Sequence, residues 1–350
     1  MLTSLLDYEL PEAAIAQRPL SDRDAARLLV VARDGVRDAR FRDWAELVPE
    51  GSLVVFNDTR VLRARILGTR PETGGRVELL LTTRIESASH EDEVWLALGR
   101  ANRPLRPGAR VVAGALHCEV LSSDDAGTLR VRVTANGGVA TALETHGHVP
   151  LPPYVRRPDD AADAERYQTV FAKHAGSVAA PTAGLHATEA TLGRLRARGV
   201  ATAFTTLHVG VGTFRPVSTD DLDDHVMHEE HFSVSPELAH AVDAARRRGG
   251  AVVAVGTTVV RSLESARDPK DPRRVRPATG TTRLLIQPGY AFGPVDALLT
   301  NFHMPKSTLL ALVAAFAGRD RMLAAYRSAL ELGYRFLSYG DAMWVPERLA

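Results

Sequence analysis

Apolar runs typical of strands alternate with segments of helical period from about residue 150 to the end of the sequence. Residues 188–198 have the helical period, Thr188 is placed to cap the N-terminus, and Gly199 is placed to end the helix. A strand pattern follows, and then Ser235 with Pro236 begins another helix, where proline is tolerated because its missing N–H would have no helical partner. This alternation predicts a layered α/β domain with a mostly parallel sheet.

The pattern changes between about residues 61 and 149. Short alternating strands follow one another there with almost no helical period, and 124–127 has the composition of a hairpin turn. Such spacing predicts a small antiparallel β-barrel inserted into the α/β domain. We therefore expect a discontinuous α/β domain of residues 1–60 and 150–350, and a barrel domain of residues 61–149.

The charges are balanced, with 43 lysine and arginine residues against 42 aspartate and glutamate residues. No global basic field therefore requires a nucleic-acid partner, although a local patch is compatible with this balance. The single cysteine, Cys118, excludes an internal disulfide and is typical of a reducing compartment. The acidic start does not resemble a signal peptide, and the longest apolar stretch, 309–317, is shorter than the roughly twenty residues that cross a bilayer. We expect a cytoplasmic monomer without a membrane partner.

Three histidines, His186, His208 and His303, each lie in a polar loop directly after an apolar run. Ligands of α/β proteins bind beyond the carboxyl ends of the strands, so we expect these loops to line one shared pocket. A neutral histidine suits proton transfer, whereas no Ser–His or Cys–His nucleophile motif is evident. The sequence therefore predicts an enzyme.

Gly256, Thr257 and Thr258 follow a strand and begin a helix, so their backbone N–H groups suit an anion such as a carboxylate or phosphate. A simple capping turn explains the same residues equally well. Arg261 and Glu264, one helical turn apart, suit a surface ion pair.

Gly210 and Gly212 resemble half of a dinucleotide-binding fingerprint, but Arg215 stands where the third glycine would be. We reject a nicotinamide site, although both glycines still permit close approach of a ligand. Tyr339 ends the last predicted strand, at 336–339, and Asp341 follows it; the two suit a cationic ligand, or Asp341 merely caps a turn.

The segment 225–231 carries three histidines and superficially resembles a metal-ligand cluster. Its spacing fits neither the H-E-x-x-H motif nor a Cys/His zinc site. We therefore interpret His225, His228 and Glu229 as uncoordinated polar site residues and expect no metal.

Ordered motifs extend over nearly the whole chain. They lie at 7–11, 15–17, 27–29, 55–61, 148–154, 167–170, 180–186, 207–214, 256–258, 261–265, 301–303 and 336–343. In this order they resemble the S-adenosylmethionine:tRNA ribosyltransferase-isomerases of queuosine biosynthesis.

The resemblance implies a two-domain enzyme, an α/β domain with a small β-barrel, that acts on tRNA whose wobble base is 7-aminomethyl-7-deazaguanine. The ribosyl part of S-adenosylmethionine would move onto the aminomethyl group and isomerise to an epoxycyclopentane. The products would be epoxyqueuosine in tRNA, adenine and methionine. S-adenosylmethionine would be consumed as the donor, and neither a metal nor another cofactor is expected.

The resemblance also implies roles for the candidate residues. A sulfonium acidifies the adjacent C5′–H, and His208 ranks before His186 and His303 as the base because glycines flank it. Asp341, Glu264 and Tyr339 would hold the sulfonium or the ammonium of the donor. Arg261 and 256–258 would receive its carboxylate, and Lys306, Arg60 and Arg215 would contact tRNA phosphates. The remaining substrate-binding candidates are Asn57, Thr59, Pro181, Thr182, Gly184, Gly210, Gly212, Thr213, His225, His228, Glu229 and Asn301.

Ala187, Asp58 and Gln287 depart from the residues common in the family at these positions. Two other hypotheses stay open. An S-adenosylmethionine-dependent tRNA methyltransferase would release S-adenosylhomocysteine, and a catalytically silent homologue would bind the anticodon arm and release neither adenine nor methionine.

Overall fold

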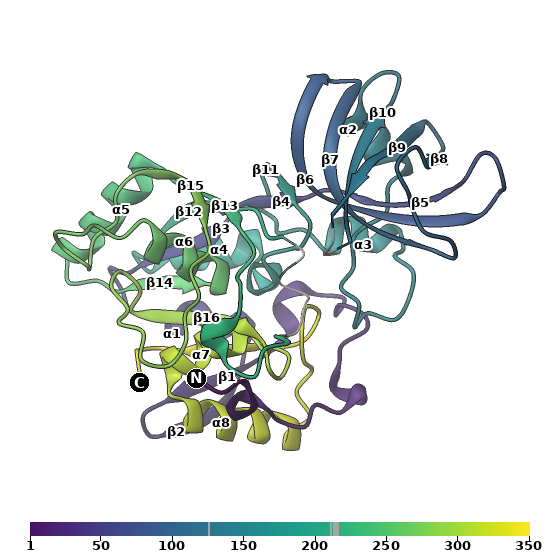
Figure 1. The fold of residues 1–350 in the computed structure, drawn as a ribbon. Helices are drawn as coiled ribbons and strands as arrows, with labels where there is room; N and C mark the ends of the chain where they lie inside the picture. Colours follow the sequence, from purple (N-terminus) through teal and green to yellow (C-terminus); the bar gives the residue numbers. More distant parts are fainter. Residues whose placement is uncertain (125–126, 211, 213–216) are drawn as a thin grey trace.

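A nine-stranded sheet forms the centre of the computed structural model, which describes residues 1–124, 127–210, 212 and 217–350 (Figure 1). The strand order is β15-β13-β12-β3-β14-β16-β17-β1-β2. The strands are β1 (Arg27–Ala32), β2 (Gly35–Arg40), β3 (Leu53–Asn57), β12 (Ala201–Leu207), β13 (Glu230–Val234), β14 (Val252–Val255), β15 (Ala278–Thr282), β16 (Ala297–Asn301) and β17 (Ala342–Val345).

The middle of this sheet is parallel, because β12, β3, β14 and β16 run in the same direction. Antiparallel pairs flank it: β13 with β12, β15 with β13, β17 with β16, and β2 with β1. The α/β domain with its inserted barrel confirms the predicted fold class, but the sheet is mixed rather than mostly parallel, because antiparallel pairs are as frequent as parallel ones.

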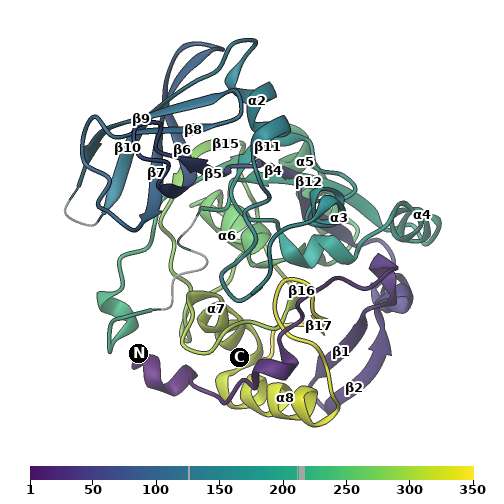
Figure 2. The ribbon, with the colours of Figure 1, turned by 90° about the vertical axis from the view of Figure 1, so that its right-hand side faces the viewer.

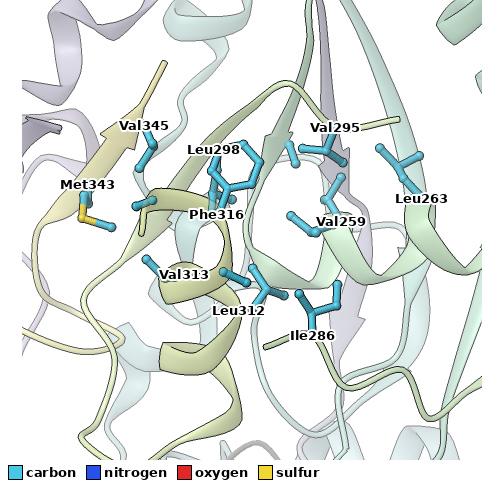
Figure 3. Close-up of a cluster of buried hydrophobic side chains, with 14 of the residues drawn as sticks. Val259, Leu263, Ile286, Val295, Leu298, Leu312, Val313, Phe316, Met343 and Val345 are labelled. Atoms are coloured by element: carbon cyan, nitrogen blue, oxygen red, sulfur yellow. The ribbon is translucent and has the colours of Figure 1, made fainter. Parts of the chain in front are cut away.

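Alternate residues of the strands pack on opposite faces of the sheet. In β3, Leu53 and Val55 belong to one core cluster, whereas Val54 and Phe56 belong to another. The first cluster is covered by α5 (Pro236–Arg247), α6 (Thr257–Ser265), α7 (Thr308–Ala317) and α8 (Arg319–Glu331), and the second by α1 (Trp44–Leu47) and α4 (Glu189–Ala197). Figure 3 shows part of the first cluster, where Val259 of α6, Leu298 of β16 and Phe316 of α7 meet. Full burial of each such side chain contributes about 2 kcal/mol to the free energy of unfolding.

The inserted region forms a closed antiparallel barrel in the order β10-β7-β6-β5-β8-β9. Its strands are β5 (Arg65–Thr69), β6 (Arg76–Ser89), β7 (Asp92–Ala101), β8 (Arg110–Ala113), β9 (Leu116–Ser123) and β10 (Thr128–Thr134). The helix α2 (Val139–His146) packs three of its side chains into the barrel core. Figures 1 and 2 show the barrel set apart from the main sheet. The exact domain bounds at 61 and 149 stay a prediction.

A small parallel sheet of β4 (Thr59–Val61) and β11 (His174–Ser177) lies where the chain passes between the barrel and the main sheet. The short helix α3 (Ala161–Arg166) precedes β11 in the chain. Asp160 and Asp163 form a capping box at the start of α3, which satisfies the free N–H groups of its first turn.

Two strands that the apolar runs after residue 280 predict, one at 283–287 and one at 336–339, are wrong. The segment 336–339 is a turn, and β17 begins only at Ala342, because Leu337 has φ of 71° and a side chain at Gly340 would lie 2.4 Å from the carbonyl oxygen of Arg335. The segment 283–287 is irregular, and β15 instead uses the threonine-rich residues before it.

None of the described helices combines the length and apolar composition that crossing a membrane requires.

Candidate active site

One pocket lies where the carboxyl ends of β14 and β16 meet the amino end of β17. Because β17 is antiparallel to β16, with Ala342 opposite Asn301, the turn before β17 lies beside the end of β16. We call this the sheet-end pocket, and it measures about 790 Å³ including its open mouth. It brings together these predicted site residues: Pro181, Thr182, Gly256, Thr257, Thr258, Arg261, Asn301 and His303.

The N-terminus of α6 forms one wall of the sheet-end pocket. Gly256 has φ of 93° and provides no side-chain cap for the first turn of the helix. The free N–H groups and the helix dipole therefore give this wall a partial positive charge, which favours an anion.

Three buried polar atoms of this pocket's lining residues have no hydrogen-bond partner among the described residues: Thr258 Oγ1, Arg261 Nη2 and Asn301 Oδ1. Arg261 uses its other guanidinium nitrogens, because Nη1 donates to Glu230 and Nε donates to the carbonyl oxygen of Leu284 at 3.0 Å. Buried polar atoms in folded proteins are nearly always hydrogen-bonded, so these three atoms are candidates for contact with a ligand that has both acceptor and donor groups.

His303 lies in the sheet-end pocket, and its Nε2 is 2.9 Å from the hydroxyl oxygen of Thr300. Its backbone N–H donates to the hydroxyl of Tyr326, which fixes the position of the residue. Burial lowers the pKa of His303 to about 3, so the ring is neutral and a weak base at neutral pH.

His208 lies in a second space, which we call the interdomain cavity. Barrel residues and main-domain residues line it together, and it measures about 1050 Å³ including its mouth. It shares Val209 and Glu230 with the sheet-end pocket, so the two spaces adjoin.

The ring of His208 is held on two sides. Its Nδ1 lies 2.8 Å from Thr59 Oγ1, and the Thr59 hydroxyl is also 3.4 Å from the carbonyl oxygen of His174, to which it donates. With the Thr59 proton on the carbonyl oxygen of His174, the Thr59 oxygen can accept the Nδ1–H of His208, which leaves the lone pair on Nε2; the 2.8 Å distance also fits the opposite tautomer, in which Thr59 donates to Nδ1. A Cβ at Gly176, where φ is 153°, would lie 2.8 Å from the His208 ring. Burial, and then the proximity of His231 and His174, lowers the pKa of His208, so its ring is neutral at pH 7.

His186 occupies a third position, in a smaller pocket that Tyr339 also lines. Its Nε2 accepts from Asn301 Nδ2 at 3.3 Å, and its ring lies 5.2 Å from the ring of Phe41. Burial, and then the charge of Arg335, lowers the pKa of His186 to about 4.

The prediction of one shared pocket for the three histidines is therefore wrong. His303, His208 and His186 line three neighbouring spaces. The expected strand before His186 is absent from the main sheet, because β11 ends at Ser177 and pairs with β4.

The residues predicted to hold the cationic part of the donor have structural partners. Asp341 accepts from the backbone N–H groups of Arg27 at 2.9 Å and Arg335 at 2.7 Å. Glu264 accepts from the N–H of Gly293, and burial raises its pKa to about 7. Asp341 thus caps the turn before β17 by accepting from two backbone N–H groups. The predicted ion pair of Arg261 with Glu264 is absent, because Arg261 pairs with Glu230.

Tyr339 likewise donates to Asp163 Oδ1 at 2.7 Å, in the pocket of His186. Asn57 hydrogen-bonds the backbone of Leu207 through both side-chain atoms, which ties the end of β3 to the end of β12. Gly184 lies in the turn before His186, where a Cβ would be 3.0 Å from Thr169.

Other predicted residues lie around these spaces. His225, His228 and Gly212 line a small pocket beside Arg261, and Gly210 and Glu229 line the interdomain cavity. Arg60 is exposed, and Lys306 is half-exposed with its Nζ 2.7 Å from Asp7. Thr213 and Arg215 lie outside the described residues. Within the described ranges, no group of three or more histidine, cysteine, aspartate or glutamate side chains is arranged to hold a metal ion.

Comparison with known proteins gives one family for the chain. Residues 3–345 match the family model described as queuosine biosynthesis protein. The chain belongs to this family.

Relatives within the queuosine biosynthesis family match over their full length. The S-adenosylmethionine:tRNA ribosyltransferase-isomerase of Sorangium cellulosum is 53% identical, over 99% of this chain and 98% of that protein. The protein of the same name from Anaeromyxobacter dehalogenans (strain 2CP-C) is 51% identical, over 99% of this chain and 100% of that protein. A crystal structure of S-adenosylmethionine tRNA ribosyltransferase from Thermotoga maritima is similar with a TM-score of 0.55 and 34% identity, over 98% of this chain and 100% of that one.

Glu230 is a site residue of this queuosine biosynthesis family member that the sequence reasoning missed. It is 5% exposed, accepts from the N–H of Gly210 at 3.1 Å, and pairs with Arg261. The alternating pattern of β13 could have indicated it, because Glu230 lies on the same buried face as Phe232 and Val234. The neighbouring Glu229, which the sequence pattern favoured, is exposed and pairs with Arg283.

Proposed function

We propose that this protein transfers and isomerises the ribosyl moiety of S-adenosylmethionine onto tRNA in queuosine biosynthesis. The acceptor is the aminomethyl nitrogen of 7-aminomethyl-7-deazaguanine at the wobble position. A bond forms between this nitrogen and the donor's ribosyl carbon skeleton, while the bonds to adenine and to the methionine sulfur break. The products are epoxyqueuosine in tRNA, adenine, methionine and a proton. Full-length relatives that carry the ribosyltransferase-isomerase name support this proposal.

The main support for a donor site is the set of buried atoms in the sheet-end pocket that lack a hydrogen-bond partner among the described residues. Arg261 Nη2, Thr258 Oγ1 and the α6 N-terminus are complementary to a carboxylate, whereas Asn301 Oδ1 is an acceptor for an N–H group. The donor carries both kinds of group, in its methionine carboxylate and in its ammonium and adenine amino groups. S-adenosylmethionine is consumed as a substrate, so the proposal includes no resident cofactor and no metal.

His208 is the best supported base among the three histidines. Its ring is neutral at pH 7, its Nδ1 is positioned by Thr59, and it lies in the cavity that adjoins the sheet-end pocket. The pKa is about 3 for His303 and about 4 for His186. Both rings are therefore weak bases for proton abstraction near neutral pH. We expect activity to decrease only as the pH falls below the ordinary histidine pKa of about 6.5.

The decisive experiment incubates the pure protein with S-adenosylmethionine and tRNA that carries 7-aminomethyl-7-deazaguanine. We expect stoichiometric adenine and methionine, and epoxyqueuosine in the digested tRNA. Release of S-adenosylhomocysteine would instead identify a methyltransferase, and tRNA binding without either product would identify a silent homologue. Arg60 and Lys306 are exposed cations for tRNA phosphates, so the affinity for tRNA should fall with salt.

A further inference from the structure

The interdomain cavity is built from both domains. The barrel contributes Thr83, Arg84 and Trp95 from β6 and β7, and α2 contributes Ala140. The indole N–H of Trp95 donates to Glu93 at 2.9 Å, and Glu93 also accepts from Arg84 at 2.9 Å, so this wall is internally fixed. No barrel residue was among the sites expected from the sequence, because the barrel strands show only a packing pattern.

We propose that the interdomain cavity binds the acceptor nucleotide, flipped out of the anticodon loop, so that the barrel forms one wall of the catalytic site. This inference rests on the proposed function and adds the location of the acceptor. Enzymes that act on a base of a nucleic acid place that base in a pocket outside the stack. With a volume of about 1050 Å³ including its mouth, the cavity lies in the size range of ligand sites.

The contact between the two spaces provides the geometry for a two-substrate reaction. Val209 and Glu230 line both the sheet-end pocket and the interdomain cavity. A donor in the first space and an amine in the second can therefore meet at this common wall. His208 lies next to Val209 in the chain and lines the acceptor side, where a proton is released when the amine reacts.

The carboxylates of the cavity are already paired with arginines. Glu93 accepts from Arg84, Glu229 pairs with Arg283, and Glu230 pairs with Arg261. Among the described lining residues there is therefore no excess of free cations to draw in backbone phosphates, whereas the carboxylate oxygens can accept from the N–H groups of a base. The base would therefore enter the cavity while its phosphates stay at the surface.

Blocking the cavity from exposed positions tests the proposal without disturbing a core. Ala140 is exposed on α2 and lines the cavity, and Thr83 is exposed on β6 and lines it from the barrel. We expect Ala140→Trp and Thr83→Trp each to raise the KM for tRNA at least about tenfold. Thr145→Trp is the matched control, because Thr145 is exposed on the same helix and is not part of the cavity lining.

The Kd of S-adenosylmethionine, measured by calorimetry without tRNA, should stay at the wild-type value in both blocking variants. The proposal is overturned if both variants keep the wild-type KM for tRNA, or if they weaken donor binding as much as tRNA binding. A wild-type protein that releases no adenine would instead contradict the proposed function. In that case direct tRNA binding, followed by fluorescence anisotropy in the same variants, still tests the cavity.

Discussion

Replacing Arg261 and Glu230 tests whether the sheet-end pocket recognises the donor carboxylate. Their relative exposures are 6% and 5%, so both charges lie inside the protein. Arg261→Gln alone leaves the Glu230 carboxylate buried without its cation, which costs about 3–5 kcal/mol of unfolding free energy. Adding Glu230→Gln removes that uncompensated charge, so we expect the double variant to be more stable than the single one.

The effect on binding follows from the unpaired Arg261 Nη2. A hydrogen bond between charged groups contributes about 1.5–3 kcal/mol, which corresponds to roughly a 10- to 150-fold change in Kd. We expect the wild-type protein to prefer S-adenosylmethionine over its decarboxylated analogue by that factor. In the double variant the remaining preference should come from the α6 N-terminus, about 0.3–1 kcal/mol, or at most about fivefold.

Calorimetric titration of each protein with both ligands measures this preference, and urea unfolding measures the stability. Arg267→Gln is the matched control, because Arg267 follows the other end of α6 and lies 3.7 Å from Glu264, outside the sheet-end pocket lining. A double variant that retains the full wild-type preference would refute the carboxylate role of Arg261. A single variant as stable as the double variant would refute the electrostatic account of the buried pair.

Three further substitutions test the placement of individual residues. Gly176→Ala brings a methyl group to 2.8 Å from the His208 ring, and we expect kcat to fall at least about tenfold with an unchanged donor Kd; an unchanged kcat would contradict the role of His208. His186 has a folded pKa of about 4 against 6.5 unfolded, so the unfolded chain binds the proton first and stability is lost as the pH falls from 6.5 to 4. His186→Gln should reduce that slope by up to about 1.4 kcal/mol per pH unit, and a wild-type slope in denaturant titrations would show that another group causes it. Asp341→Ala leaves two backbone N–H groups without acceptors and should cost about 2–6 kcal/mol of unfolding free energy, whereas loss of donor binding at wild-type stability would restore the donor role.

Local structure was predictable wherever its determinants lie close together in the sequence. Thr188 caps α4 and Ser235 caps α5, each through a hydrogen bond to a residue three positions later. The glycine and threonines at 256–258 lie between β14 and α6 as expected. Such features depend on atoms within about one helical turn, so the sequence alone identifies them.

The partners of the site residues were not predictable in the same way. The sequence offered two roles for Asp341, and the turn before β17 together with the N–H groups of Arg27 and Arg335 decided for capping. Glu230 became a site residue because β13 turns its buried face toward Arg261. Neither outcome follows from local pattern, because each needs the order and direction of strands that are distant in the chain.

The sequence by itself determined the fold class, the family motifs and the three histidines as candidates. Only the tertiary structure assigned His303, His208 and His186 to separate spaces and brought the barrel against His208. The physical reason is that hydrophobic periodicity and end-capping act over a few residues, whereas a cavity is formed by surfaces whose meeting depends on the packing of whole elements.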